Sequence, residues 1–367
     1  MTDELNLPPS ADEPPAPVSF RSVTLSVSML VSACLVALLA WLPAPYQVLM
    51  PGPTVDVLGG QTAGEPLIEI SGAPTYPASG QLRLTTVSAV GTPGINAYPL
   101  VVLRNWWSPS SQVSQVVEQP TETRAQIDQS NQAQMVGSQE AATVAALTEL
   151  GYQIPTVLMI GSVVDGSGSQ GVLEPGDVVL GLDGTPTADF ATLTDLLTAT
   201  EPGTTVTVDV RRGGDELHLP VVTTAGDGRA LLGISLGATV DPTFDLPVDV
   251  KINIDHIGGP SAGTMFALGI IDRLTPEDEV GGQVIAGTGT IDEAGNVGPI
   301  GGIRQKLAGA RRDGAAWFLA PQSNCDEVVG HVPSGLHVVA VSTLHEAREA
   351  VVAIGSGNGA SLPTCSG

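Results

Sequence analysis

An uncharged run of twenty residues near the N-terminus, Val23–Leu42, constrains this chain more than any other feature. About twenty apolar residues are the length at which an α-helix crosses the hydrocarbon core of a bilayer. Trp41 and Tyr46 lie at the far end of the run, and aromatic side chains gather at membrane–water interfaces. The run therefore predicts a single transmembrane helix over 23–42 that anchors the rest of the chain.

A cleaved secretory signal is the alternative to an anchor, because both begin with an apolar helix. The segment before the run is poor in positive charge, and no small-x-small cleavage site precedes Pro43–Pro45. Arg21 is the only flanking positive charge, and the next basic residue is Arg83. The positive-inside rule then predicts a cytoplasmic N-terminus and places everything after Tyr46 outside the cytoplasm, with the protein in the cell membrane.

Composition narrows the functions open to the chain. Its 38 acidic residues against 14 basic ones give a net charge of −24, which would repel phosphate backbones and excludes a nucleic-acid partner. With 44 Gly and 29 Pro among 367 residues, we expect many turns and short elements in two or three domains. No group of His, Cys and Asp has metal-ligand spacing, so we expect no metal and no other cofactor.

Cysteine usage agrees with an extracytoplasmic location. Of three cysteines, Cys34 lies in the predicted span, which leaves Cys325 and Cys365 as a candidate disulfide. Such a bridge would close a loop of about 40 residues and contribute about 3 to 4 kcal/mol through the chain entropy of the unfolded state. Two unrelated free thiols are the alternative.

The region between the span and residue 150 is predicted to contain short strands, turns and one helix. Leu82–Val87 alternates apolar and polar residues as a strand does. The Gln-, Ser- and Thr-rich stretch 108–134 predicts exposed backbone. Ser138 then caps a predicted helix, 139–150, which ends at Gly151.

Residues 157–224 form one small predicted module of a strand, a loop, a helix and a strand pair: Val157–Val164, Leu173–Gly184, Phe190–Ala199 and Thr205–Val222. The loop contains Leu-Glu-Pro-Gly-Asp, an apolar run and an Asp-Gly turn, and on these motifs the module resembles a PDZ domain of the bacterial protease-associated type. In that family a bound peptide adds a strand beside the helix, and its carboxylate rests in a turn of backbone amides. The resemblance makes Leu150, Gly151 and Tyr152 the candidate turn; a β-rich spacer with a generic turn is the alternative.

A serine follows a glycine turn in the next segment. Val248–Asp255 alternates with a period of two, which predicts a strand. The chain then turns on two glycines, the second of them Gly259, and is expected to enter a helix at Pro260 that runs to about residue 271. Ser261 would lie in the first helical turn. There the backbone amides around Gly259 and Ala262, with the helix dipole, can stabilise an oxyanion.

A serine nucleophile needs a base, and Lys306 is the candidate. A lysine accepts a proton only when it is neutral, so desolvation must lower its pKa from about 10.4 to about 7 or 8. Small and apolar residues flank Lys306 on both sides, at 299–303 and 307–310, and would exclude water. The only other lysine, Lys251, falls on the polar face of its predicted strand and is expected to be solvated.

Three motifs around these residues resemble the proteolytic domain of the Lon family of Ser/Lys dyad peptidases: Gly-Pro-Ser-Ala-Gly at 259–263, Ala-Gly-Thr-Gly-Thr-Ile at 286–291 and Gly-Pro-Ile-Gly-Gly at 298–302. The resemblance runs from about 246 to 352. It implies that Ser261 is the nucleophile, Lys306 the general base and Thr288 a supporting residue that orients the lysine. Two departures are visible. Gly259 stands where ATP-dependent Lon proteases have an aspartate, which Asp255 is a candidate to replace, and the chain has no Gly-x-x-x-x-Gly-Lys phosphate loop.

The succession of span, PDZ module and Lon-like domain is similar to that of the membrane-anchored PDZ-Lon proteins of bacteria. The resemblance implies an ATP-independent serine endopeptidase that hydrolyses unfolded or membrane-tethered proteins, with the PDZ module capturing substrates, and it allows a homo-oligomer because Lon-type domains form rings. The predicted fold class is α+β. The predicted segments are a disordered acidic tail (1–22), the transmembrane helix (23–42), a β-containing region (46–150), the PDZ domain (151–225), the Lon-like domain (230–355) and a C-terminal tail (356–367).

Two other interpretations remain open. Residues 259–263 also satisfy Gly-x-Ser-x-Gly, the nucleophile elbow of α/β-hydrolases, whose candidate partners here are Asp313, Asp326, His331, His337 and His345. His256, five residues before the serine, is expected to be structural. The second interpretation is a membrane-tethered PDZ binding scaffold without catalysis.

Overall fold

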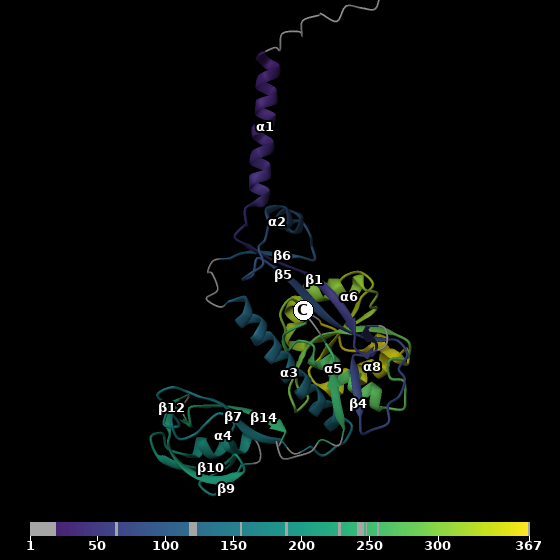
Figure 1. Cartoon of the computed structure of the whole chain (residues 1–367). Coiled ribbons are helices and arrows are strands. Elements are labelled where there is room, and N and C mark those ends of the chain that lie inside the picture. The colour runs from purple at the N-terminus through teal and green to yellow at the C-terminus, as the bar shows by residue number, and fades with distance from the viewer. Residues whose placement is uncertain are drawn as a thin grey trace, which may run out of the picture. The chain divides into compact units, whose positions relative to one another are not determined.

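The structure of the protein is a computed structural model, which describes residues 20–62, 65–116, 123–154, 156–187, 190–226, 229–240, 246, 248–254 and 257–365 (Figure 1). Most of the predicted acidic tail lies outside these residues, as do Asp255 and His256. Helices and strands are mixed throughout the described chain, which confirms the predicted α+β class.

The chain divides into two compact units, 1–48 with 89–120 and 49–88 with 121–367. The first unit contains helix α1 (Phe20–Trp41), helix α2 (Pro99–Trp106), strand β6 (Gln112–Gln115) and the start of strand β1 (Tyr46–Asp56). Among the described helices, only α1 is long and apolar enough to cross a membrane. That finding rests on length and composition, and a signal sequence passes the same test.

The second unit contains five strands of a six-stranded sheet, in the order β20-β19-β16-β5-β1. Four of these strands pair in parallel: β5 (Gln81–Val90), β16 (Val284–Gly287), β19 (Trp317–Pro321) and β20 (His337–Val341). Parallel sheets are usually covered on both faces, and Leu82 and Leu84 of β5 are fully buried. Strand β5 is thus an inner strand of this sheet, although the sequence placed it in a separate N-terminal region.

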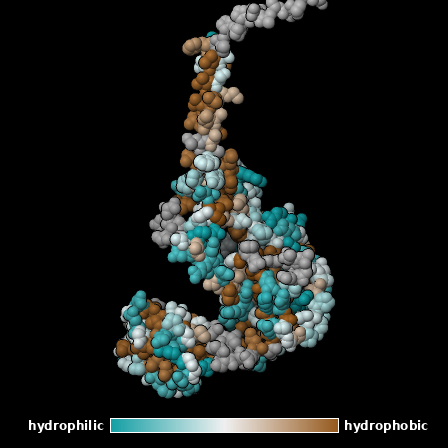
Figure 2. Space-filling view, viewed as in Figure 1, coloured by the Kyte–Doolittle hydropathy of each residue, from teal (hydrophilic) through white to brown (hydrophobic). Residues whose placement is uncertain are grey.

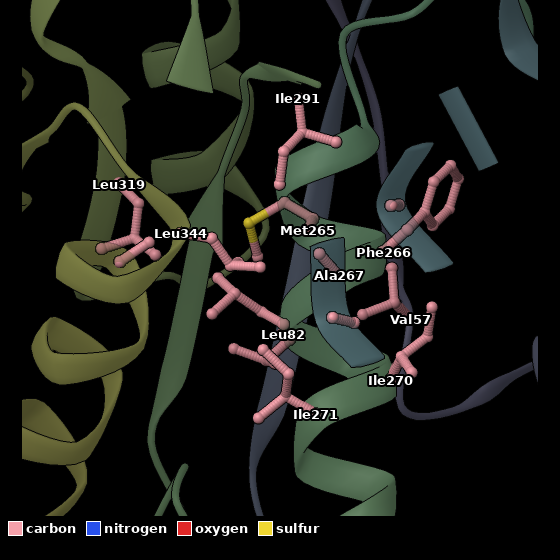
Figure 3. Packing of buried hydrophobic residues seen from close by; sticks show 14 of the residues in the cluster. Val57, Leu82, Met265, Phe266, Ala267, Ile270, Ile271, Ile291, Leu319 and Leu344 are labelled. Atoms are coloured by element: carbon pink, nitrogen blue, oxygen red, sulfur yellow. The ribbon is translucent and has the colours of Figure 1, made fainter. Parts of the chain in front are cut away.

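Helix α5 (Gly263–Leu274) lies at the centre of the core (Figure 3). Every residue from Gly263 to Asp272 is buried. Met265, Phe266 and Ile271 belong to one apolar cluster with Leu82 of β5 and with Leu344, the first residue of helix α8 (Leu344–Gly355). Burial of each such large side chain stabilises the fold by about 1.5–3 kcal/mol. The start of α5 is therefore held firmly in place.

Helix α3 (Arg124–Glu149) is longer than the helix predicted over 139–150. It begins at a capping box in which the Thr123 hydroxyl accepts the Gln126 N–H and the Gln126 side chain accepts the Thr123 N–H. Buried alanines in its second half pack against α5. The predicted cap, Ser138, is instead a buried residue inside the helix. The polar stretch before Ser138 is helical from Arg124 onward, whereas exposed backbone was predicted there, and most of its side chains up to Gln134 are exposed.

The predicted PDZ module has a sheet of its own with the order β11-β10-β8-β7-β14. Its strands are β7 (Thr156–Val163), β8 (Val178–Leu182), β10 (Thr205–Arg212), β11 (Asp215–Val222) and β14 (Ile234–Val240). Helix α4 (Phe190–Ala199) has the predicted bounds. Strand β14 pairs antiparallel with β7, so this sheet extends past the predicted limit at residue 225. Long-range pairing of this kind leaves no local signal in the sequence.

Short elements and a disulfide complete the second unit. The short strands are β2 (Gly60–Thr62), β3 (Glu65–Pro66), β4 (Ile68–Ser71), β9 (Thr185–Pro186), β12 (Thr224–Gly226), β13 (Arg229–Leu231), β15 (Asp249–Ile252), β17 (Thr290–Ile291) and β18 (Val297–Gly298). The remaining helical elements are α6 (Ile303–Arg312), α7 (Cys325–Val328), η1 (Gln322–Asn324) and η2 (Gly359–Ser361). Cys325 and Cys365 are joined by a disulfide, with their Cα atoms 5.0 Å apart.

Candidate active site

Ser261 lies in a turn between strand β15 and helix α5. The helix begins at Gly263 with Ala262 as its N-cap, so Ser261 precedes the first helical turn instead of belonging to it as the sequence predicted. Gly259, at the start of the turn, has φ = 90°, a left-handed conformation that glycine adopts at little cost. The turn therefore reverses the chain and presents the Ser261 hydroxyl at the N-terminal end of a buried helix.

Hydrogen bonds from two other segments hold this turn. The Gly259 N–H donates to the Asn131 carbonyl (2.9 Å), and the Ser138 hydroxyl donates to the Pro260 carbonyl (3.0 Å); both partners lie on α3. From the other side, the Ser261 carbonyl accepts the Gly289 N–H at 3.0 Å. Asn131 and Ser138 were not predicted to lie near the serine, and only the position of α3 in space reveals them.

Lys306 occupies the first turn of α6 and reaches the serine. Its Nζ lies 2.8 Å from Ser261 Oγ and 2.8 Å from Thr288 Oγ1. Thr288 is fully buried, and its hydroxyl donates to the Ser261 carbonyl at 2.9 Å. The three side chains that the sequence singled out from distant segments are thus brought into direct contact.

Burial changes the acid–base behaviour of this lysine. Lys306 is only 3 % exposed, and its apolar neighbours Ile303, Leu307 and Ala310 are fully buried. Among the residues that the structure describes, no carboxylate pairs with its ammonium group. Desolvation therefore lowers the pKa of Lys306 to about 7. Lys251, by contrast, is exposed on β15.

The contact between Ser261 and Lys306 lies at the wall of a cleft of about 570 Å³ within the second unit. Leu84, Val87 and Met135 supply apolar lining. No described histidine lines this cleft. None of the five predicted hydrolase partners lines this cleft, and two of them are engaged elsewhere: Asp313 accepts from Arg312 and Thr54, and His345 contacts Glu149. The Gly-x-Ser-x-Gly motif is thus not accompanied by a Ser-His-Asp arrangement in the described part of the chain.

Comparison with known proteins identifies two segments. Residues 250–353 match the family model of the Lon protease (S16) C-terminal proteolytic domain, and residues 134–223 match that of the PDZ domain. The chain contains a Lon-type proteolytic domain and a PDZ domain. Curated relatives include Lon protease 1 of Bacillus subtilis, 28 % identical over 164 residues, and Lon protease 1 of Sorangium cellulosum, 39 % identical over 106 residues.

These matches are partial on both sides. They cover 37 % and 28 % of this chain, respectively, and the aligned part spans 21 % of the Bacillus protein and 13 % of the Sorangium protein. Among solved structures, the PDZ domain of an SdrC-like protein from Listeria monocytogenes is 26 % identical, over 22 % of this chain and 86 % of its own length, with a TM-score of 0.21.

The Lon-type domain is larger in space than its match in sequence. The family match begins at Val250, yet strands β1 and β5 and helix α3 precede that residue and contribute to the same core. The PDZ match begins at residue 134, inside α3, whose second half packs on α5. The region that the sequence divided off as 46–150 is therefore partly a component of the Lon-type core.

One of the two predicted oxyanion donors is already engaged. The Gly259 N–H donates to Asn131, so it is not available to a reacting carbonyl in this conformation. The N–H of Ala262 donates to no acceptor among the described residues, and Ala262 caps the buried helix α5. Of the two, only Ala262 has an N–H without an acceptor among the described residues, and Ala262 lines the cleft.

The predicted carboxylate turn of the PDZ domain does not have free amides. The N–H groups of Leu150, Gly151 and Tyr152 donate to the α3 carbonyls of Ala146, Thr148 and Leu147, respectively, so this segment is the C-terminal cap of the helix. The predicted ligand turn is a helix cap, and the prediction was wrong because both kinds of turn contain glycine.

A different turn of the PDZ domain borders an apolar cavity. The cavity, of about 240 Å³, lies between α4 and the start of β14, with Leu197, Leu232 and Leu236 in its lining. Gly233 has φ = 70°, and in the described chain the N–H groups of Leu232 and Gly233 donate to no acceptor. The local sequence signal of this turn is the Leu-Leu-Gly-Ile run at 231–234, which was not among the predicted site residues.

Proposed function

We propose that this protein is a serine endopeptidase in which Ser261 is the nucleophile and Lys306 the general base. The observation that carries the proposal is the 2.8 Å contact between Lys306 Nζ and Ser261 Oγ, made by a lysine whose burial lowers its pKa to about 7. A lysine with that pKa is substantially neutral at physiological pH and can take the hydroxyl proton. The Lon-type family match supports the same reaction class.

Thr288 orients the lysine for this proton transfer. Its hydroxyl proton is committed to the Ser261 carbonyl, so its oxygen can only accept from Lys306. A neutral lysine then donates one N–H to Thr288 and turns its lone pair toward the Ser261 hydroxyl. Thr288 thus acts as a positioning residue for the base.

The reaction follows from this arrangement. Lys306 removes the Ser261 proton as the oxygen attacks the peptide carbonyl, and the Ala262 amide at the N-terminal end of α5 stabilises the oxyanion. The lysinium then protonates the leaving amine, and the acyl-enzyme is hydrolysed by water activated by the same lysine. The neutral form of Lys306 thus gains its charge as the oxyanion develops nearby.

An extended peptide fits the cleft beside β5. Strand β16 pairs with β5 only from Gln81 to Leu84, so Thr86–Ser88 have no strand partner on that side among the described strands, and they line the cleft with Ser261. A substrate that adds a strand there must be unfolded locally. Neither lysine follows a glycine, so the chain has no phosphate loop of the Gly-Lys type, and we propose that cleavage is independent of ATP.

The PDZ domain captures substrates through the turn at Leu232 and Gly233. Strand β14 is an edge strand of its sheet among the described strands, so a peptide can add to it beside α4. The C-terminal carboxylate of the peptide would accept hydrogen bonds from the two free amides, and the terminal side chain of the peptide would enter the apolar cavity. Helix α1 anchors the protein, with the N-terminus in the cytoplasm, and tethering brings substrates to the cleft.

The test is degradation of an unstructured fluorogenic peptide by the full chain in detergent micelles, without nucleotide. Ser261→Ala and Lys306→Ala are expected to abolish cleavage. Lys251→Ala is the matched control, because it removes the only other lysine from an exposed site and should leave the rate unchanged. Cleavage that survives Lys306→Ala refutes the dyad. A wild-type chain that does not cleave the peptide in this assay supports a binding scaffold.

A further inference from the structure

We propose that the exposed face of helix α2 docks on the lipid surface beside the end of α1, as a second membrane contact of this protein. The proposal rests on the membrane anchor of the proposed function. It concerns the first unit alone, which contains both helices.

Helix α2 has one apolar face that nothing in the described chain covers. Leu100, Leu103 and Trp107 are spaced three and four residues apart, which places them on one side of the helix and its C-cap. They are 67 %, 50 % and 78 % exposed, respectively, whereas Val102 on the other side is buried. In Figure 2, hydrophobic residues lie along α1 and again just beyond its end. Large exposed apolar patches mark interaction surfaces.

Short-range contacts fix this face close to the end of α1. The Ala44 N–H, three residues after the last residue of α1, donates to the Ala97 carbonyl at 2.8 Å, just before α2. The Tyr46 and Trp106 rings meet edge to face with centroids 5.8 Å apart. If α1 spans a bilayer, α2 is therefore held at the depth of the adjoining headgroups.

The charge and residue types of this unit fit a lipid surface. Residues 20–48 and 89–116 contain no Asp or Glu, although the chain has 38, and their only charges are Arg21 and Arg104. Arg104 follows Leu103 on α2 and can extend its guanidinium to lipid phosphates while its stem stays with the apolar face. Trp107 and Tyr98 are exposed, and both residue types favour the membrane–water interface. The carboxylates of the unit, Asp3, Glu4, Asp12, Glu13 and Glu118, all lie outside the described residues, so no carboxylate within 20–48 or 89–116 repels anionic lipids.

The test uses the full chain reconstituted into vesicles of phosphatidylcholine and phosphatidylglycerol. Tryptophan emission is recorded with ordinary lipids and with lipids brominated near the headgroup, which quench only indoles that contact the bilayer. The variant Trp41→Phe/Trp106→Phe/Trp317→Phe leaves Trp107 as the reporter. Its emission is expected to fall strongly in brominated vesicles. Leu103→Glu in the same background is expected to restore most of that emission by lifting the helix from the lipid.

Two further single-tryptophan chains separate this inference from the anchor. A chain that keeps only Trp41 reports the span, and one that keeps only Trp317, a strand residue of the second unit, is the control that should not be quenched. Quenching of Trp41 without Trp107 overturns the docking and leaves the anchor intact. Absence of quenching at both positions overturns both.

A protein partner or a second copy on the same face gives a different result. Trp107 would then be shielded from a water-soluble quencher and yet be insensitive to brominated lipid, which also overturns the proposal. Where the triple substitution impairs folding, the difference in quenching between the wild-type chain and Trp107→Phe gives the same readout. An equal loss of emission in those two chains contradicts the docking.

Discussion

The cleft at Ser261 differs from the groove beside β14, by which we mean the apolar cavity between α4 and β14 together with the turn at Leu232 and Gly233. Polar groups are paired within the protein in the cleft and unpaired in the groove. In the cleft, Lys306 and Thr288 are buried and hydrogen-bonded to each other and to the serine. In the groove, the Leu232 and Gly233 amides have no acceptor in the described chain, and one edge of β14 is unpaired among the described strands. A lysine base works only if water is kept away from it, whereas peptide capture needs backbone groups left open. The two regions therefore tolerate different substitutions.

The largest effect is expected from changing the charge state of the buried base. Lys306→Arg keeps a long cationic side chain, but a guanidinium does not deprotonate and cannot accept the serine proton. We expect kcat/KM for peptide cleavage to fall by about 10²–10⁴-fold, the range attributed to general base catalysis. Lys251→Arg makes the same exchange at the exposed lysine of β15 and is the control, which should keep wild-type activity. Comparable activity in the Lys306→Arg variant and wild type would show that proton transfer does not run through this residue.

The pH profile tests the same base without mutation. Because burial disfavours the charged form, the pKa of Lys306 is lowered to about 7, and the fraction of neutral lysine rises with pH through that value. The rate should therefore fall about tenfold per pH unit below pH 7 and level off above it. A stopped assay of kcat/KM against pH measures this, and a profile that stays flat from pH 5 to pH 9 contradicts the depressed pKa.

Thr288 should matter less than the lysine, because it orients the base and does not react. Thr288→Val removes the acceptor for Lys306 Nζ and the donor to the Ser261 carbonyl. We expect a loss of about 10–100-fold in kcat with little change in KM. Thr288→Ser keeps the hydroxyl and should recover most of the activity. If Val and Ser behave alike, the hydroxyl has no orienting role.

The smallest effect on chemistry is expected from the open groove. Leu197→Asp places a charge in the apolar lining between α4 and β14. Protein substrates with a free C-terminus should show a KM raised by about tenfold, because tethering is lost, while short peptides that reach only the cleft keep their kinetics. Steady-state kinetics with both substrate types measure the difference. An equal loss for short peptides would mean that the groove acts on the cleft itself.

Much of the candidate site was predictable from local sequence. Gly-Pro-Ser-Ala-Gly, the threonine at 288 and the lone apolar-flanked lysine at 306 were recognisable because each depends on its immediate neighbours. The bounds of α4 were predicted for the same reason, since its residues form a short continuous helical stretch. The fold class and the two domain types followed from such motifs.

Most of the wrong predictions concern contacts between segments far apart in the chain. Ser138 was predicted as a helix cap, but it lies inside α3 and binds the Pro260 carbonyl, 122 positions away. The prediction of Leu150–Tyr152 as a ligand turn is the local exception: these residues cap α3 through carbonyls three to five positions earlier, and a helix cap and a ligand turn both contain glycine. Gly259 was assigned to the oxyanion site, yet its N–H is engaged by Asn131.

By itself, the sequence determined the candidate residues for the proposed chemistry and one N-terminal segment apolar enough for a membrane. Only the tertiary structure decided how they meet. It brought Lys306 within 2.8 Å of Ser261 and buried it. It also placed β5 and α3 around the same helix α5 and left β14 as an edge. The physical reason is that motifs record short-range requirements of backbone and side chain, whereas desolvation and strand pairing depend on contacts between residues separated by many positions in the chain.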